Sequence, residues 1–210
     1  EGNSSTSTSV PSTISNTAPE VSGVVLNNLS PYTNEVLSVS PSTFDFNGDT
    51  VTLNYEWHVV DASQGGQDII VYSGNGSMFS TLDGSQSYGF DRDDEVYVMV
   101  TPNDGTDDGV TVESDHAMVQ NSLPTSPTVQ VVGASGAVEV GAGEEDLVCT
   151  ITGTSIDVDG DSVDYTYDWY VNDVSVSNSE TLSPTLFEEG DTIMVIVTPN
   201  DGEDDGSSFQ

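Results

Sequence analysis

The sequence has almost no basic residues. It contains 36 Asp and Glu against a single Lys or Arg, Arg92, which gives 210 residues a net charge of −35. Without bases to neutralise phosphates, the chain is not expected to bind nucleic acid or an anionic membrane surface. The one Cys excludes an internal disulfide and a zinc site built on cysteines. Two His leave little for general-base or transition-metal chemistry. No apolar run approaches the roughly 18 residues of a membrane span, so no membrane insertion is expected.

The acidity has to be compensated if the chain is to fold. An apolar content of 34% with this charge is close to the composition of disordered proteins. Two carboxylates 4 Å apart repel by about 4 kcal/mol at an effective dielectric of 20, against a typical stability of about 5–15 kcal/mol. Bound Ca²⁺ and a halophilic setting are both open as the source of compensation. The patterned, repeated sequence favours a folded chain.

Two tandem copies of one unit make up most of the chain. The segment FDFNGDTVTLNYEW at 44–57 aligns without a gap with IDVDGDSVDYTYDW at 156–169. Further on, VTPNDGTDDG at 100–109 matches VTPNDGEDDG at 197–206. The two offsets, 112 and 97 residues, differ because the first copy carries a 15-residue insertion between the two motifs. We predict domains at 16–120 and 121–210, joined by short linkers that contain proline.

Alternating apolar and polar residues, separated by Asn-Gly and Asp-Gly turns, predict about seven short strands in each copy. The fold class expected is therefore all-β: two tandem immunoglobulin-like β-sandwich domains in a rod. Trp57 and Trp169 are predicted core residues on the third strand of each copy. Cys149 is predicted to be a small buried hydrophobic residue on the second strand, with a reactive thiol as the alternative.

Residues 1–15 are rich in Ser and Thr. Residues 1–19 align with 106–124, where Asn16 and Pro19 match Asn121 and Pro124. This alignment predicts that 1–15 form the last strand of a preceding repeat, with a flexible linker as the alternative. The second copy ends at Gln210, within the position of its own last strand. Its open edge could accept residues 1–15 of another copy, so that the chain polymerises by strand donation. A fragment of a longer repeat protein explains the same ends.

Two acidic loops recur in each copy, and we expect them to meet at one pole of the sandwich. Ca²⁺ takes six to eight oxygen ligands and tolerates irregular geometry, so these loops are candidate calcium sites. Acidic turns that cap their own backbone are the structural alternative. The candidate ligands are Asp45, Asn47, Asp49, Asn103, Asp104, Asp107 and Asp108 in the first copy, and Asp157, Asp159, Asp161, Asn200, Asp201, Asp204 and Asp205 in the second.

A further acidic segment precedes the sixth strand of the first copy. Asp91, Asp93 and Asp94 are predicted to lie at the opposite pole, facing the calcium pole of the second copy. Ligands shared across this junction would stiffen it. The alternative is that Arg92, in the same segment, pairs with a neighbouring carboxylate.

The repeated motifs resemble those of tandem Ig-like, PKD-like and cadherin-like β-sandwich repeats in large secreted or cell-surface proteins of bacteria and archaea. The D-x-[DN]-G-D loop, the Y-x-W-x-V strand, the V-T-P-N-D-G-x-D-D-G loop and the N-[TS]-x-P linkers carry this resemblance. It covers almost the whole chain and implies a spacer, an adhesin stalk or a fibre segment outside the cell or at its surface, with neighbouring repeats or other copies as partners.

Other functions find less support in the sequence. No Ser-His-Asp set, phosphate-binding glycine loop or zinc spacing is visible, so no enzyme is expected. A module that binds cell-surface glycans would need exposed aromatic residues, for which the candidates are Tyr72, Phe79, Tyr88 and Phe90, or these residues belong to the core. Candidate glycosylation sequons begin at Asn3, Asn28 and Asn75.

Overall fold

The computed structural model describes residues 12–76 and 78–210 as two β-sandwiches. The first contains β1 (Glu20–Ser22), β2 (Val36–Val39), β3 (Ser42–Phe44), β4 (Thr52–Asp61), β5 (Gln67–Gly76), β6 (Ser80–Asp83), β7 (Glu95–Asn103), β8 (Val112–Glu113) and β9 (Ala117–Met118). The second contains β10 (Thr128–Gly133), β11 (Leu147–Gly153), β12 (Asp164–Val171), β13 (Val174–Ser177), β14 (Thr181–Leu182) and β15 (Ile193–Asn200). Two short 3₁₀ turns, Ala62–Gln64 and Pro184–Leu186, complete the described elements. No helix among the described residues has the length and apolar character to cross a bilayer.

The strand pairing is that of an immunoglobulin-like sandwich in both copies. In the first, β1 pairs with β3 and β2 with β6 in one layer, while β5, β4, β7 and β8 form the other, with β9 also on β7. In the second, the layers are β10-β11-β14 and β13-β12-β15. The paired strands run antiparallel, and alternate residues along each strand face the core. The predicted all-β fold with two tandem sandwiches is therefore confirmed.

A tryptophan occupies the centre of each core. Trp57 on β4 and Trp169 on β12 have no exposed surface, and each indole N–H has an acceptor. Trp57 Nε1 donates to Ser80 Oγ at 3.0 Å, and Trp169 Nε1 donates to the Ser179 carbonyl at 2.8 Å. A buried indole N–H without a partner is costly, so these bonds fix the ring orientation as well as the packing.

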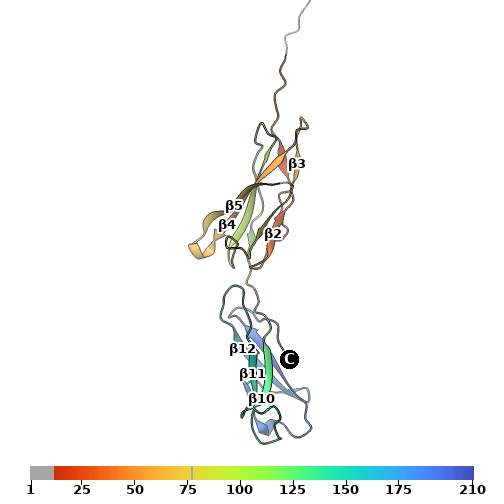
Figure 1. Ribbon diagram of the computed structural model, residues 1–210, viewed down its shortest axis with the longest axis vertical. Helices are drawn as coiled ribbons and strands as arrows, with labels where there is room; N and C mark the ends of the chain where they lie inside the picture. Colours follow the sequence, from red (N-terminus) through yellow and green to blue (C-terminus); the bar gives the residue numbers. More distant parts are fainter. Residues whose placement is uncertain (1–11, 77) are drawn as a thin grey trace, which may run out of the picture.

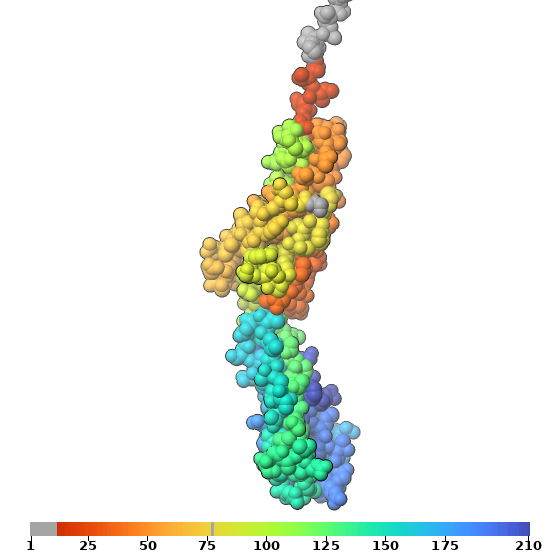
Figure 2. All heavy atoms as spheres, viewed as in Figure 1, coloured from red at the N-terminus to blue at the C-terminus, as the bar shows by residue number. Residues whose placement is uncertain are grey.

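The two sandwiches lie end to end as an elongated molecule, with residues 12–19 at one tip (Figure 1). The surface view shows an arm of residues around 60–75 projecting from the side of the first repeat (Figure 2). This arm is the hairpin of β4 and β5, whose partners run from Leu53↔Gly76 to Asp61↔Gln67. The corresponding hairpin of the second repeat, β12 with β13, is shorter, so the 15-residue insertion lies mainly here.

Residues 12–19, the described part of the N-terminal segment, contain no strand. Residues 1–11, and with them the sequon at Asn3, lie outside the described part of the chain. The strand assignment for 1–15 and the domain boundaries at 16 and 121 remain predictions from the sequence.

Candidate functional site

The two acidic loops of the first repeat are joined by a residue that precedes both of them. Asn16 Nδ2 donates to Asp104 Oδ2 at 2.8 Å and to Asp107 Oδ2 at 2.9 Å, both in the loop after β7. Its Oδ1 accepts from Asn47 Nδ2 at 2.7 Å, in the loop before β4. The prediction that the two loops share a pole is confirmed, and an asparagine side chain connects them. We call this set of residues the Asn16 pole.

In the second repeat Asn121, the counterpart of Asn16, makes the same pair of bonds to the loop after β15. Asn121 Nδ2 donates to Asp201 Oδ2 at 3.0 Å and to Asp204 Oδ2 at 3.3 Å. We call this the Asn121 pole. Sequence reasoning aligned the two asparagines but did not assign them this role. The recurring N-[TS]-x-P before each unit was the signal that could have indicated it.

In the loops after β7 and β15, most of the hydrogen bonds are made within the loop itself. Asp104 Oδ1 accepts from the backbone N–H groups of Thr106 and Asp107 at 2.7 and 2.8 Å, and Asp201 Oδ1 does the same for Glu203 and Asp204. The N–H of Asp107 and the amide of Asn16 hold the pKa of Asp104 below its usual value. The N–H of Asp204, followed by Asn121, does so for Asp201. These carboxylates therefore stay ionised. The geometry is that of acidic turns that cap their own backbone, the alternative to calcium sites given by the sequence.

The outer residues of these two loops form a second pair of matching contacts. Asn103 Nδ2 donates to Asp108 Oδ1 at 2.7 Å, and Asn200 Nδ2 donates to Asp205 Oδ1 at 2.8 Å. Both asparagines also accept from the glycine N–H two residues on. Each pair therefore closes its own turn.

The loop before β12 gathers carboxylates more closely. Asp157, Asp159 and Asp161 each offer an oxygen within 4.8 Å of the other two, the one such group of acids within residues 12–76 and 78–210. The side chains are half-buried. Asp157 Oδ1 accepts from the N–H groups of Asp159 and Asp161, while its Oδ2 is buried without a hydrogen-bond partner. In the first repeat the middle position is Asn47, so only Asp45 and Asp49 are acids there.

The joint between the repeats is centred on Arg92. It lies in the turn before β7, at the end of the first repeat that faces the second. Arg92 Nη1 donates to Asn121 Oδ1 at 2.8 Å and pairs with Asp161, and Glu203 Oε1 lies 3.8 Å away. Partial burial lowers the pKa of Arg92, but the hydrogen bond to Asp161 and the nearby acids outweigh this and raise it. The guanidinium therefore remains charged, with acceptors from both acidic loops of the second repeat around it.

One substitution between the repeats explains why the joint can form. At the Asn16 pole, Asn47 donates to Asn16 Oδ1. Its counterpart Asp159 has no proton to donate when ionised, and instead accepts from Ser122 N–H at 2.7 Å and Ser122 Oγ at 3.2 Å. Asn121 Oδ1 is then available to Arg92.

Two of the acids that flank Arg92, Asp94 and Asp93, shape the turn in which it lies. Asp94 is 5% exposed and accepts from the N–H of Ala62 at 2.8 Å and of Asp91 at 2.9 Å. Its burial raises its pKa. Asp93 adopts a left-handed φ of 71°, which turns the chain at the tip, and its Oδ2 lies 3.9 Å from Arg92 Nε. The contact across the joint is made by Arg92. Metal ligation by Asp91, Asp93 and Asp94 remains a prediction from the sequence.

The other candidate residues are distributed over the first repeat. Phe90 is 1% exposed and belongs to the core, so it is not a surface aromatic, while Tyr72, Phe79 and Tyr88 are exposed. Asn28 is half-buried: its Oδ1 accepts from Ser30 N–H and its Nδ2 donates to Glu35. Asn75 is exposed on β5.

No protein-family model and no curated protein matches the chain. Among solved structures, similarity is found to a structure on Dscam isoform specificity, at 13% identity and a TM-score of 0.29, over 92% of this chain and 45% of that one. The FN1–FN3 domains of chicken CNTN1 are similar at 12% identity and a TM-score of 0.30, over 93% of this chain and 63% of that one. The chain thus spans less than two thirds of either structure. Both TM-scores are below 0.5, so the fold assignment rests on the strand pairing described above.

Proposed function

We propose that the chain is a non-catalytic structural segment of an extracellular or cell-surface fibre, stalk or adhesin, built from PKD-like repeats of the bacterial and archaeal kind. The observation that carries this proposal is the joint. The sole base of the chain reaches across it to Asn121, Asp161 and Glu203, so that one repeat continues into the next as a rod. Placing a guanidinium there costs desolvation, which the surrounding carboxylates offset. A spacer requires this control of the joint, whereas two independently acting domains do not.

A direct test is small-angle scattering of the chain in dilute solution. A rod with a fixed joint gives one pair-distance distribution with the length of two sandwiches end to end. Two modules on a loose tether give a broad distribution with a shorter mean length, and this result would contradict the structural role.

We further propose that Ca²⁺ binds at the acidic loops, with the Asp157, Asp159 and Asp161 cluster as the first site. The donor set fits: these are hard carboxylate oxygens, and a 4.8 Å limit between them matches two ligands on opposite sides of an ion at about 2.3–2.6 Å. The buried, unpartnered Asp157 Oδ2 also supports this assignment. Arg92 forms an ion pair with one member of this cluster, Asp161. Bound Ca²⁺ would neutralise the other two carboxylates as well.

Calorimetric titration with Ca²⁺ and Mg²⁺, followed by thermal unfolding, tests the site. We expect Ca²⁺ to raise the unfolding temperature of the second repeat. At a thousandfold excess over its dissociation constant, the bound ion should add about 4 kcal/mol to the free energy of unfolding. Asp157→Asn should lose this site, because an amide oxygen keeps the turn but removes the charge. The matched variant Asp45→Asn in the first repeat should keep it. An equal rise with NaCl, or in Asp157→Asn, would instead indicate general charge screening in a halophilic protein.

A surface-binding module is a second candidate function. It is favoured by Tyr72, Phe79 and Tyr88, which are 42%, 56% and 50% exposed and lie between the start of β5 and the start of β7 in the first repeat. A glycan array would test it. Binding that survives substitution of all three residues to Ser would contradict this role.

A further inference from the structure

One strand of the first repeat has a long edge that no other described strand covers. β5 stands at the end of the sheet order β5-β4-β7-β8 and pairs only with β4. Within residues 12–76 and 78–210, no backbone hydrogen bond outside that pair involves Gln67–Gly76. The arm therefore presents the outward N–H and C=O groups of a ten-residue strand. An edge of this kind is a template for another strand.

The matching strand of the second repeat is protected against such pairing. β13, the counterpart of β5, has only four residues. Residues 172–182, from the hairpin turn to Leu182, include the acids Asp173 and Glu180. Short edge strands and charges are two means by which proteins prevent one sheet from pairing with another. The corresponding segment of the first repeat, 62–82, has one acid in 21 residues, Asp68, so it lacks both kinds of protection.

The single acid of the arm is bound within its own sheet. Asp68 Oδ2 accepts from Tyr97 OH at 2.8 Å, and its Oδ1 lies 3.0 Å from His58 Nδ1. Tyr97 is on β7 and His58 is on β4, so the carboxylate reaches over β4, away from the free edge. The free edge of β5 is thus uncharged, in a chain whose net charge is −35.

Apolar side chains are exposed on both faces of this edge. A bulge in the ladder places Tyr72 opposite Trp57 and Ile70 opposite His58. Trp57 faces the core, so Tyr72 is on the core side of the sheet and Ile70 on the outer side. Tyr72 and Ile70 are 42% and 53% exposed. The edge therefore fits an extended, uncharged partner that has apolar side chains on both faces.

We propose that β5 pairs with β5 of a second copy of the chain, antiparallel about a two-fold axis, so that two rods are joined side by side. β5 has the properties that its own edge requires of a partner: it is extended, apolar on both faces and uncharged along the edge. Antiparallel pairing about the middle of the strand places the two Asp68 residues at opposite ends. They are then roughly 20 Å apart along the strands, well beyond a Debye length of about 8 Å.

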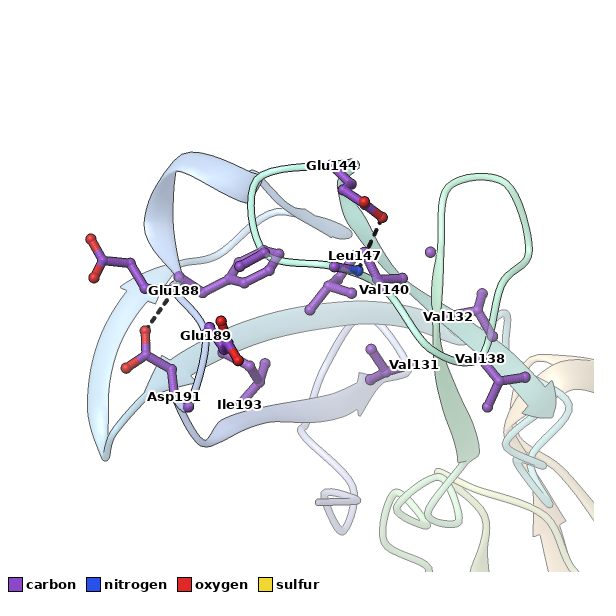
Figure 3. Close-up of a pocket in the computed structure, with 15 residues that line it drawn as sticks. Val131, Val132, Val138, Val140, Glu144, Leu147, Glu188, Glu189, Asp191 and Ile193 are labelled. Atoms are coloured by element: carbon purple, nitrogen blue, oxygen red, sulfur yellow. Dashed lines mark hydrogen bonds between the residues drawn. The ribbon is translucent and has the colours of Figure 1, made fainter.

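The charge of the chain favours the arm over other apolar surfaces for contact between copies. A pocket of about 600 Å³ in the second repeat has valines in its lining, but Glu144, Glu188, Glu189 and Asp191 line it as well (Figure 3). A second copy placed there would bring further acids against these four. The arm projects from the side of the rod, so two arms can meet while the acidic bodies remain apart (Figure 2).

The proposed contact is isologous, because the same strand is used on both molecules, and it closes at a dimer. It depends neither on bound Ca²⁺ nor on the joint between the repeats. Sedimentation velocity over a range of protein concentrations therefore tests it in chelator, at physiological ionic strength. The chelator removes any calcium bridge between acidic surfaces. We expect a monomer–dimer equilibrium with no larger species.

Two matched variants test the surface. Ile70→Asp should weaken dimerisation at least about tenfold, since it replaces an apolar side chain of the contact with a charge. Val174→Asp, on the counterpart strand β13, should leave dimerisation unchanged. Both side chains are more than half exposed, at 53% and 63%, so each variant should fold and unfold as the wild-type monomer does.

Cysteine crosslinking tests the antiparallel arrangement separately. Cys149 is 1% exposed and does not compete under mild oxidation. Tyr72→Cys lies beside the proposed axis and should form a disulfide with its counterpart, whereas Gln67→Cys lies at the end of the strand, far from its own. A parallel pair would crosslink both variants. Crosslinking of both or of neither, a wild-type chain that stays monomeric at every concentration, or dimers that persist in Ile70→Asp would overturn the proposal while leaving the rod and the calcium site intact.

Discussion

Arg92 and Asn121 meet across the joint, with Arg92 Nη1 donating to Asn121 Oδ1 at 2.8 Å. The same atom of Asn16 accepts from Asn47 within its own repeat. In the second repeat this asparagine oxygen therefore accepts its hydrogen bond from the neighbouring repeat, whereas in the first repeat the donor lies within the same repeat. The segment Phe90–Asp94 aligns with Phe187–Asp191, so Glu189 is the counterpart of Arg92 in the second repeat. The exchange depends on Asp159, where the first repeat has Asn47, and on Arg92, where the second repeat has Glu189. These two positions therefore determine what kind of joint a repeat can make.

Arg92→Gln should loosen the joint without unfolding either repeat. The variant loses the ion pair with Asp161 and the charge beside Glu203, contacts about a quarter exposed on the Arg92 side. We expect a loss of about 1–3 kcal/mol at the interface, the range for hydrogen bonds to charged groups with partial screening. Small-angle scattering should show a shorter mean length and a broader distribution. Arg92→Lys keeps the charge but has a shorter side chain without the planar guanidinium, so it should be intermediate. A wild-type scattering curve for Arg92→Gln would remove the role given to this residue.

Asn16→Asp should destabilise the first repeat, and Asn121→Asp should destabilise the second by less, because Arg92 Nη1 lies 2.8 Å from Asn121 Oδ1 and offsets part of the new charge. The change replaces a donor shared by two carboxylates with a third carboxylate, at Asp104 and Asp107 or at Asp201 and Asp204. Repulsion between close surface acids and the lost bonds should cost about 1–3 kcal/mol. Thermal unfolding should show one transition lowered, and the loss should shrink as salt rises. Asn75→Asp, exposed on β5, is the control that should change neither transition.

Much of the fold followed from the sequence, because a period of two and paired Asp-Gly turns leave few arrangements for each copy. Cys149 and Trp169 lie on the second and third strands of their sandwich as the alternation indicated. The shared pole of the acidic loops also followed, since chain order in such a sandwich brings those loops together. These features depend on local patterns that repeat.

The connections between loops could not be predicted in the same way. Asn16 lies 88 residues from Asp104, and Arg92 lies 69 residues from Asp161. Nothing in the alternation of apolar residues determines such distant polar contacts. The acidic segment at 91–94 predicts shared metal ligands, which stays a prediction. The alternation did not indicate that Asp94 accepts from Ala62 and Asp91 in its own turn while Arg92 makes the contact across the joint. That choice depends on burial, which a charge pattern does not encode.

Cys149 should be unreactive in the folded protein. It is 1% exposed, and burial, with the charge of Glu180, raises its pKa to about 11. The thiolate is the reacting form, so alkylation at mildly alkaline pH should be at least about a hundredfold slower than for a free thiol. The reaction should reach full rate in guanidinium chloride. Fast labelling of the native chain would favour the reactive-thiol alternative.

His116 should make the stability of the first repeat depend on pH. Its ring stacks on Tyr97, with centroids 4.3 Å apart, and Nδ1 lies 3.0 Å from Glu95 Oε2. The hydrogen bond to Glu95 outweighs partial burial and, with help from Glu113, raises the pKa of His116 above its ordinary 6.5. Because the folded state binds this proton more tightly, the stabilisation is fully present below about pH 6.5 and is lost as the pH rises through the raised pKa.

The measurement is the free energy of unfolding of the first repeat across this pH range, by urea at fixed ionic strength. Wild type should lose stability as the pH rises, and His116→Gln should flatten this slope while leaving the second repeat unchanged. Glu95→Gln should flatten it as well, because an amide oxygen keeps a hydrogen bond but not the charge that favours the imidazolium. High salt should weaken the effect, since both side chains are about 40% exposed. A slope that persists in His116→Gln would place the titrating group elsewhere in the sheet.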